Sequence, residues 1–364
     1  MPGSPHDLIP VIRSDAHLGH TGLVEFTAGR ELACHESPER AIEIERALRA
    51  DDGFTFDEPT AYGSGPILAV HDAALVEVVE HAWTDALAAG DADGSRPLIP
   101  DTFQLEAYAR PMRLDTVPDG AHRRLGAFCF DSATPIVAGT ALAARAAVDV
   151  ALTAAERVVD GAPLAYGLCR PPGHHAARRM LGGYCFYNNA AIVAEWLLRE
   201  RGFARVAILD VDYHHGNGTQ QLFWERGDVL YLSLHADPAR AYPYFSGYAT
   251  ETGAGDGAHM TRNFPLPAGT DLDGYASELT TALDLMAGFE PDAPIILSLG
   301  FDTFERDPIG DLALRTADYQ EIGRLIGALG APVVALQEGG YAVDAIGANA
   351  VAFLTGLRGT SASG

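Results

Sequence analysis

The stretch 208–218 reads ILDVDYHHGNG and places two carboxylates and two histidines directly after a short apolar run. A short run of apolar residues is typical of a strand that is covered on both faces of a parallel sheet. In open parallel sheets, ligands bind beyond the carboxyl ends of the strands. The stretch therefore predicts a parallel α/β fold and also the edge of the sheet at which a site lies.

The C-terminal half repeats this pattern, because short apolar runs alternate with longer amphipathic ones. Such alternation is typical of a multi-stranded, mostly parallel sheet with helices on both faces. The predicted strands are 163–169, 205–211, 228–235, 293–300 and 331–337. The predicted helices are 189–201, 273–288, 317–329 and 344–357, with a further helix at 35–50 that starts with Ser37 as N-cap and Pro38 in its first turn.

The N-terminal third is less regular, and the segment 83–135 is rich in Asp, Gly, Pro and Arg. We interpret the chain as one domain over residues 1–364, with 83–135 as a long insertion. The apolar side chains of Leu125, Phe128 and Phe130 in this insertion need a surface that covers them. The sequence thus predicts a homodimer whose interface includes much of the insertion.

Composition limits the partners and the chemistry. The formal net charge is −24, which argues against nucleic acid and anionic membranes as partners and favours cationic or neutral small molecules. All 25 basic residues are arginine, so a phosphate-loop lysine and a Schiff-base lysine are both excluded.

The four cysteines lie far apart and form no C-x-x-C pair, so neither a thiolate zinc cage nor a disulfide framework is indicated. The N-terminus MPGSPHDLIP lacks a basic segment followed by an apolar one, and no apolar run is long enough to span a bilayer. These features predict a cytoplasmic protein.

Chemically versatile side chains follow four of the predicted strands. RPPGHH contains His174 and His175, FDTFERD contains Asp302, EGGY contains Tyr341, and the fourth group is in DVDYHH. Because the carboxyl ends of parallel strands share one edge of the sheet, we expect these side chains to converge in one crevice.

An open metal site needs about three ligands from histidine and carboxylate, and Asp212 and His214 face the same side of an extended segment. Asp302 is the natural third ligand, whereas Asp210 lies deeper and fits a supporting role. Such a metal lowers the pKa of bound water, a neighbouring histidine takes the proton, and a tyrosine hydroxyl donates to the oxyanion. The residues indicate metal-assisted amide hydrolysis.

These motifs resemble a known family. RPPGHHAARRMLGGYCFYNNAA, ILDVDYHHGNGTQQLFWERGDVLYLSLHADP, LSLGFDTFERDP and EGGY are similar to motifs of the zinc-dependent deacetylases of the arginase/deacetylase superfamily, which includes the histone deacetylases. Within that superfamily they most resemble the acetylpolyamine amidohydrolase branch. The resemblance runs from about residue 162 to the C-terminus and is weaker at 35–50 and 70–75.

The resemblance implies a role for each matching residue. Zn²⁺, or Fe²⁺ in the cell, would be bound by Asp212, His214 and Asp302. The catalytic residues would be His175 as general base and acid, His174 as its electrostatic partner, Tyr341 polarising the carbonyl, Asp210 holding His174, and Asn217 pairing with the second tandem histidine. A structural K⁺ would be bound by Asp210, by the Ser233 hydroxyl and by backbone oxygens of Asp212, His214 and Leu234.

The resemblance also implies a narrow tunnel for a small cationic acetylated amine, lined by Gly183, Tyr184 and Tyr242. Acetylpolyamine amidohydrolases receive the distal ammonium on glutamates of the insertion. The corresponding stretch RLGAFCFDSATP has no Glu, and Glu106 lies well before it. Asp131 is the acidic residue nearest to the expected place, so we predict that it binds the ammonium.

The sequence argues against two alternatives and leaves a third open. An arginase-like ureohydrolase would need two manganese ions and an Asp-Ala-His-x-Asp run, where this sequence has DVDYH. A catalytically inactive binding protein on the same fold would have lost Tyr341 or a metal ligand. A deacetylase of protein acetyl-lysine, or of another small amide, would share the whole catalytic set.

Overall fold

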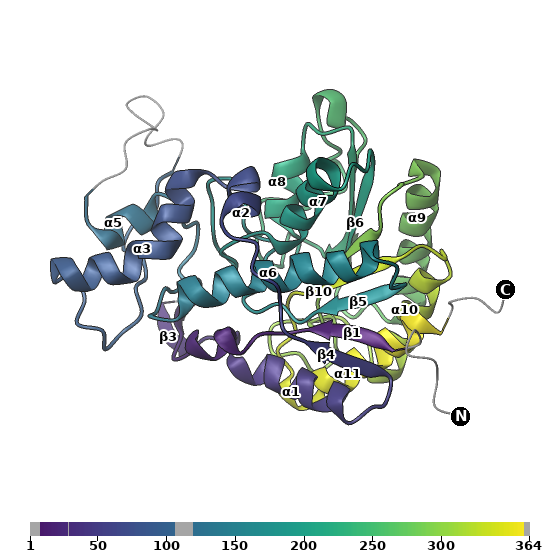
Figure 1. Ribbon diagram of the computed structural model, residues 1–364, viewed down its shortest axis with the longest axis horizontal. Helices are drawn as coiled ribbons and strands as arrows, with labels where there is room; N and C mark the ends of the chain where they lie inside the picture. The colour runs from purple at the N-terminus through teal and green to yellow at the C-terminus, as the bar shows by residue number, and fades with distance from the viewer. Residues whose placement is uncertain (1–7, 28, 106–118, 360–364) are drawn as a thin grey trace.

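The chain is built around a single large sheet in a computed structural model that describes residues 8–27, 29–105 and 119–359 (Figure 1). Eight strands pair in the order β4-β1-β5-β10-β9-β6-β7-β8, and every pairing in this sheet is parallel. The strands are β1 Ile9–Ile12, β4 Phe54–Asp57, β5 Leu164–Gly167, β6 Val206–Asp210, β7 Val229–Ala236, β8 Thr261–Leu266, β9 Ile295–Leu299 and β10 Val333–Gln337. The predicted parallel sheet is confirmed.

All five predicted strands are present, as β5, β6, β7, β9 and β10, with ends that differ by at most two residues from the prediction. The sequence prediction missed β1, β4 and β8, as well as a separate antiparallel hairpin of β2 Val24–Thr27 and β3 Arg30–Ala33. β4 and β8 are the two edge strands, and their burial is mixed. Because an edge strand is only partly covered, its sequence lacks the continuous apolar run that identifies a central one.

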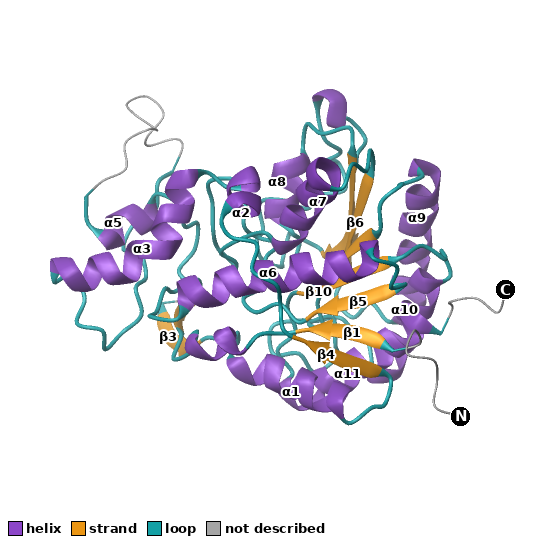
Figure 2. Cartoon of the chain, in the orientation of Figure 1, coloured by secondary structure: helices purple, strands orange, loops and turns teal. Residues whose placement is uncertain are grey.

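Helices cover both faces of the sheet, as Figure 2 shows. The helices are α1 Pro38–Arg49, α2 Gly65–Val70, α3 Ala73–Ala89, α5 Ala121–Gly126, α6 Thr140–Val159, α7 Asn189–Glu200, α8 Asn217–Phe223, α9 Leu272–Phe289, α10 Thr316–Gly327 and α11 Val343–Arg358, with 3-10 turns η2 Asp15–Gly19 and η3 Gly255–Gly257. Side chains of β10 alternate between two apolar cores. Val334 and Leu336 pack with α6 and α7, whereas Val333 and Ala335 pack with α9, α10 and α11. This alternation follows from the two-residue period of a strand.

The five predicted helices are present as α1, α7, α9, α10 and α11. In α1, Ser37 is the N-cap and Pro38 is the first helical residue, although the Ser37 side chain makes no capping hydrogen bond. The longest helix, α6, was missed. Its sequence TALAARAAVDVALTAAERVV has small alanines on nearly every side, so its buried face is defined less by apolar periodicity than by size.

The segment 83–135 is more ordered than its composition indicates. Its first residues belong to α3, which ends at Gly90 in the left-handed conformation, and α5 lies near its end. Leu125 and Phe128 are buried in the core beside α3, so these two side chains need no partner chain to cover them. Glu106 lies outside the described residues.

The fold brings four strand ends together. β5, β10, β9 and β6 are consecutive neighbours at the centre of the sheet, and each is followed by one of the predicted motifs. No helix among the described residues is long and apolar enough to span a membrane.

Candidate metal centre

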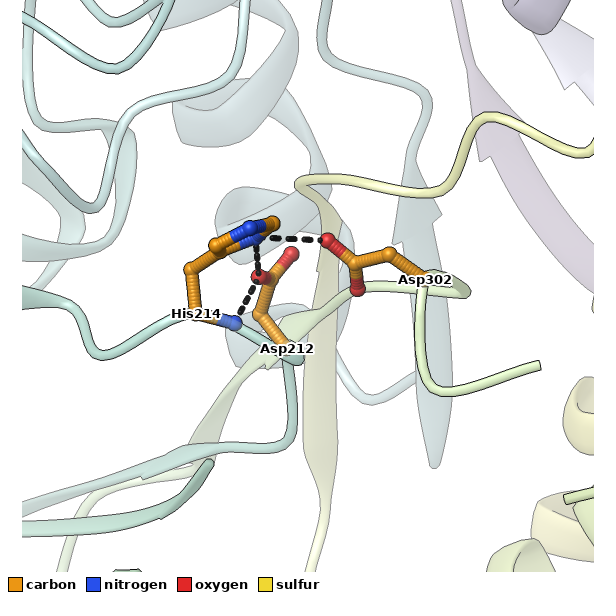
Figure 3. A group of neighbouring side chains, drawn as sticks. All are labelled: Asp212, His214 and Asp302. Carbon is orange, nitrogen blue, oxygen red and sulfur yellow. Dashed lines mark hydrogen bonds and ion pairs between the residues drawn. The ribbon is translucent and has the colours of Figure 1, made fainter. Parts of the chain in front are cut away.

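Three predicted metal ligands lie together at the ends of β6 and β9 (Figure 3). Asp212, His214 and Asp302 are buried, and one ligand atom from each lies within 4.8 Å of the others. The Nδ1 atom of His214 is 3.4 Å from Asp212 Oδ1 and 3.0 Å from Asp302 Oδ2. Nδ1 is therefore the histidine atom that faces both carboxylates.

Backbone amides fix the second oxygen of each carboxylate. Gly339 N–H donates to Asp212 Oδ2 at 2.7 Å, and Tyr213 N–H donates to Asp302 Oδ1 at 2.9 Å. A Cβ atom on Gly339 would lie only 2.6 Å from Asp212 Oδ2 and 2.4 Å from Asp302 Oδ2. A side chain at this position would fill the space between the ligands, so the chain requires glycine here.

The charge of this cluster fits a cation. The ion pairs that Asp212 and Asp302 form within the described chain involve only histidines, and neither carboxylate reaches an arginine. Burial and the neighbouring Asp212 charge raise the pKa of Asp302 to about 7. Burial opposes ionisation of Asp212 as well, but His174 and His214 hold its pKa well below the usual range. Two buried carboxylates beside one imidazole form a donor set that suits a divalent metal.

The tandem histidines after β5 lie next to this cluster, and each has a different hydrogen-bond partner. His174 Nδ1 lies 3.1 Å from Asp210 Oδ2, and His175 Nδ1 lies 2.7 Å from Asn217 Oδ1. Although burial favours neutral imidazole, Asp210 and Asp212 raise the pKa of His174 to about 10. Burial and the charge of His174 lower the pKa of His175 well below its usual value. The two rings lie with centroids 4.1 Å apart, and their surroundings shift their pKa values in opposite directions.

Tyr341 is held over the same crevice by contacts with its backbone and its ring. Asp307 Oδ2 accepts the Tyr341 N–H at 2.6 Å, and the Arg40 guanidinium lies 4.7 Å from the centre of the ring. Arg40 also donates to the backbone oxygens of Glu338 and Gly340, both at 2.5 Å. Arg40 and Asp307 thus hold both the loop EGGY and the tyrosine at its end.

The predicted potassium ligands are buried, and hydrogen bonds within the chain engage two of their side chains. Asp210, Ser233 and Leu234 have no exposed surface. The Ser233 hydroxyl lies 2.8 Å from His235 Nδ1, and Asp210 accepts from the Tyr231 hydroxyl at 3.0 Å. Potassium binding stays a prediction.

Three residues were predicted to line the tunnel, and we call them the tunnel wall: Gly183, Tyr184 and Tyr242. They lie around His175 and Tyr341. The Tyr242 ring meets the His175 ring edge-on, with centroids 5.1 Å apart. Tyr184 packs edge-on against Tyr341, with centroids 5.8 Å apart. A Cβ atom on Gly183 would lie 2.2 Å from His175 Cδ2, so this backbone passes directly over the imidazole.

The fourth predicted substrate-binding residue, Asp131, is close to this wall but does not present free oxygens to it. Asp131 Oδ2 accepts from Gly183 N–H at 2.6 Å and from the Tyr242 hydroxyl at 2.8 Å. Oδ1 accepts from the Thr134 hydroxyl at 2.9 Å and from Ala133 N–H at 3.1 Å. These contacts disagree with the prediction that the carboxylate is available to a substrate ammonium.

The structure adds two buried glutamates that the motifs did not identify. Glu338 Oε2 accepts from the amides of Gly173 at 2.6 Å and His174 at 3.2 Å, and thereby links β10 to the tandem histidines. Glu25 in β2 accepts the Tyr184 hydroxyl at 2.5 Å. Glu338 is the first residue of EGGY, so that motif offered a signal, whereas an isolated glutamate in VEFT offered none.

Comparisons with known proteins agree with this geometry. A model of the histone deacetylase domain matches residues 34–357. The chain is 43% identical over 348 residues to acetylpolyamine amidohydrolase 2 of Pseudomonas aeruginosa, covering 96% of this chain and 98% of that protein. It is 41% identical to the acetylpolyamine amidohydrolase of Mycoplana ramosa over 332 residues, 90% of this chain and 93% of the other. The crystal structure of acetylpolyamine aminohydrolase from Burkholderia pseudomallei superposes with a TM-score of 0.89 at 37% identity, covering 96% of this chain and 98% of that one.

Proposed function

The chain belongs to the histone deacetylase family, and from that premise we propose that it hydrolyses the acetyl amide of small cationic amines such as N-acetylpolyamines. It is a hydrolytic deacetylase of the metal-dependent type, consistent with the cluster of Asp212, His214 and Asp302. The observation that carries the proposal is that this cluster lies beside the tandem histidines and Tyr341 in one buried crevice.

The proposed ligands of Zn²⁺ are the three residues of the cluster. Zinc, when bound, supplies Lewis-acid chemistry that polarises a carbonyl and makes water more acidic. Fe²⁺ would suit the same donors, because imidazole and carboxylate bind both metals. Potassium at Asp210 and Ser233 is the second proposed ion, supported by a buried carboxylate that lacks an arginine partner in the described chain.

His175 is the proposed general base and acid. Its Nδ1 faces Asn217 Oδ1, so Nδ1 carries the proton and Nε2 keeps a free lone pair toward the crevice. Nε2 takes a proton from the attacking water and returns it to the leaving amine. His174 stays charged between Asp210 and Asp212 and supports the developing negative charge without transferring a proton.

Tyr341 is the proposed donor to the substrate oxygen. Burial raises the pKa of its hydroxyl well above the usual value, so the group keeps its proton and remains a donor. Asp307 and Arg40 orient the tyrosine through its amide and its ring. A fixed donor of this kind stabilises charge that develops on a carbonyl oxygen.

A cationic substrate is supported by the charge around the tunnel wall. Glu25 is buried beneath the Tyr184 hydroxyl, and within the described chain it forms no ion pair with an arginine. A buried carboxylate without a cation is costly, so an ammonium that enters along Tyr184 offsets part of that cost. The net charge of −24 acts in the same direction over a longer range.

We also propose a homodimer in the cytoplasm. Phe245 is 92% exposed and Leu105 64% exposed at the rim of a hollow of about 1090 Å³ that Tyr242 also lines. An apolar rim of this kind suits a partner surface, and a second copy of the chain is the occupant we infer. All four cysteines are free and buried, which is consistent with a reducing compartment.

A substrate panel tests the proposed function. Protein freed of metal by chelation is reloaded with Zn²⁺ or Fe²⁺ and assayed with N-acetylputrescine, N-acetylcadaverine, neutral N-hexylacetamide and an acetyl-lysine peptide. We expect turnover only with metal, and the highest kcat/KM for the acetylated diamines. Full turnover without metal would contradict the metal-dependent reaction. A preference for the peptide over both diamines would instead support the acetyl-lysine alternative.

A further inference from the structure

The Asp131 carboxylate lies at the centre of a hydrogen-bond cluster that joins separate loops. It accepts four ordinary hydrogen bonds, two on each oxygen, from Ala133, Thr134, Gly183 and Tyr242. An ionised carboxylate has about four lone-pair positions. The chain itself therefore fills the positions that a substrate ammonium would need.

The donors in this cluster are the residues of the tunnel wall. Gly183 and Tyr242 contact Asp131 directly, and the Tyr184 N–H donates to the Thr134 hydroxyl at 3.0 Å. Thr134 in turn donates to Asp131. All three wall residues are thus connected to one carboxylate, either directly or through a single hydroxyl.

This cluster also determines what surrounds His175. The Gly183 backbone passes over one part of the imidazole, and the Tyr242 ring meets the imidazole at an interplanar angle of 88°. Both groups are held by the same oxygen, Asp131 Oδ2. Phe130 stacks on the Tyr242 ring, with centroids 6.0 Å apart and an interplanar angle of 19°, and limits movement of the ring toward Phe130.

We propose that Asp131 is a positioning residue that sets the width of the acyl tunnel by holding Gly183, Tyr184 and Tyr242 around the general base. This inference rests on the proposed deacetylase function and names what Asp131 contributes to it. Asp131 acts through the wall and does not receive the distal ammonium. Its effect is therefore the same for charged and neutral amides, and it distinguishes substrates by their width.

The tyrosine hydroxyl at position 242 is the partner that makes this role specific. A phenylalanine ring would fill the same space but would leave Asp131 Oδ2 without one of its two donors. The charge-assisted hydrogen bond between the Tyr242 hydroxyl and the Asp131 carboxylate holds the hydroxyl end of the ring in place. Asp131 and Tyr242 must then act as one unit, so their substitutions are not additive.

The test compares Asp131→Asn, Tyr242→Phe and the double variant, each loaded with Zn²⁺. The substrates are N-acetylcadaverine, neutral N-hexylacetamide of equal length, and the broader N-cyclohexylacetamide. We expect Asp131→Asn to lower kcat/KM about tenfold for both linear amides, since loss of a charge-assisted bond is worth about that factor. The ratio of linear to cyclohexyl turnover should fall because the wall loosens, and the double variant should be no worse than Asp131→Asn. Zinc content should be unchanged.

The matched control is Asp292→Asn. Asp292 is an exposed aspartate that accepts hydrogen bonds from the backbone amides of Ala204 and Arg205. These residues lie just before β6, at the amino ends of the strands and away from the candidate site. The Asp292→Asn substitution removes the same charge and should leave kcat/KM for all three substrates unchanged. A rise in KM confined to N-acetylcadaverine in Asp131→Asn would overturn the proposal in favour of an ammonium receptor. Additive effects of the two single substitutions would overturn it as well. Inactivity of the unaltered enzyme on every amide would instead contradict the proposed function.

Discussion

The candidate metal centre of Asp212, His214 and Asp302 lies next to the tunnel wall, yet the chain assembles the two regions differently. Asp212 and Asp302 follow β6 and β9, which are neighbouring strands of the sheet, so the sheet itself brings their carboxylates together. Tyr184 and Tyr242 belong to separate loops, which Asp131 joins by hydrogen bonds. A site on strand ends has the rigidity of the sheet, whereas the wall is only as rigid as its side-chain bonds.

Because the two regions are held differently, we expect substitutions in them to have different effects on activity. Substitutions in the candidate metal centre, or in the residues that hold it in place, should affect the chemical step for every substrate. Changes in the wall should affect which substrates are accepted. The following predictions test this division, beginning with the largest effect.

Asp302→Ala removes a proposed metal ligand and one of the two carboxylates that face His214 Nδ1. We expect loss of bound zinc and a decrease in kcat/KM of about 10³-fold or more, because metal catalysis contributes several kcal/mol. Metal analysis and kinetics on the same sample measure both. Asp292→Asn serves again as the control for charge, and retention of full activity by Asp302→Ala would contradict the proposed ligand set.

Tyr341→Phe removes the proposed oxyanion donor but keeps the ring against Tyr184 and Arg40. We expect kcat to fall about 10²- to 10³-fold with zinc content unchanged. Tyr184→Phe is the matched comparison, because it removes a neighbouring tyrosine hydroxyl that donates to Glu25. If both variants lost the same kcat, the special role of Tyr341 would be disproved.

Glu338→Ala leaves the buried amides of Gly173 and His174 without their acceptor. We expect the free energy of unfolding to fall by about 2–4 kcal/mol, since each unsatisfied buried donor costs about 1–3 kcal/mol. Glu338→Gln keeps an oxygen for both amides and can donate to the Ser298 hydroxyl, so its loss should be less than half as large. Urea unfolding of the metal-free proteins measures both values. Equal losses would show that the charge of Glu338, and not its acceptor oxygen, stabilises the fold.

Glu25→Gln removes the buried charge beneath Tyr184 and keeps a hydrogen-bond acceptor for its hydroxyl. We expect KM for N-acetylcadaverine to rise about fivefold, because a partly screened ion interaction is worth about 1 kcal/mol, and KM for N-hexylacetamide to stay constant. Glu31→Gln on the same hairpin is the control, because Glu31 is exposed and pairs with Arg96. A similar change for both substrates would remove Glu25 from substrate selection.

Much of the site could be predicted because its signals are local. In ILDVDYHHGNG, the apolar run predicted β6, and the two-residue spacing predicted that Asp212 and His214 face the same way. Asp302 could be added because the ends of parallel strands share one edge of the sheet. The contacts of His174 with Asp210 and of His175 with Asn217 agree with the partners that the family resemblance implied.

The tunnel wall could not be predicted in the same way. From the sequence, Asp131 was the acidic residue nearest to the place where an ammonium is expected. Only the tertiary structure shows that its oxygens are taken by donors up to 111 residues away in the chain. Glu25 reaches Tyr184 across 159 residues, and no pattern in either segment indicates that contact.

The sequence by itself therefore determined the parallel sheet, the edge that carries the site and the three candidate ligands. It did so because strand periodicity and strand-end position are encoded within a few residues of each other. The orientation of Asp131, the burial of Glu25 and Glu338 and the covering of Leu125 were decided only by the tertiary structure. Whether a carboxylate faces a substrate or the chain depends on which donors the fold brings within hydrogen-bond distance, and those donors come from distant segments.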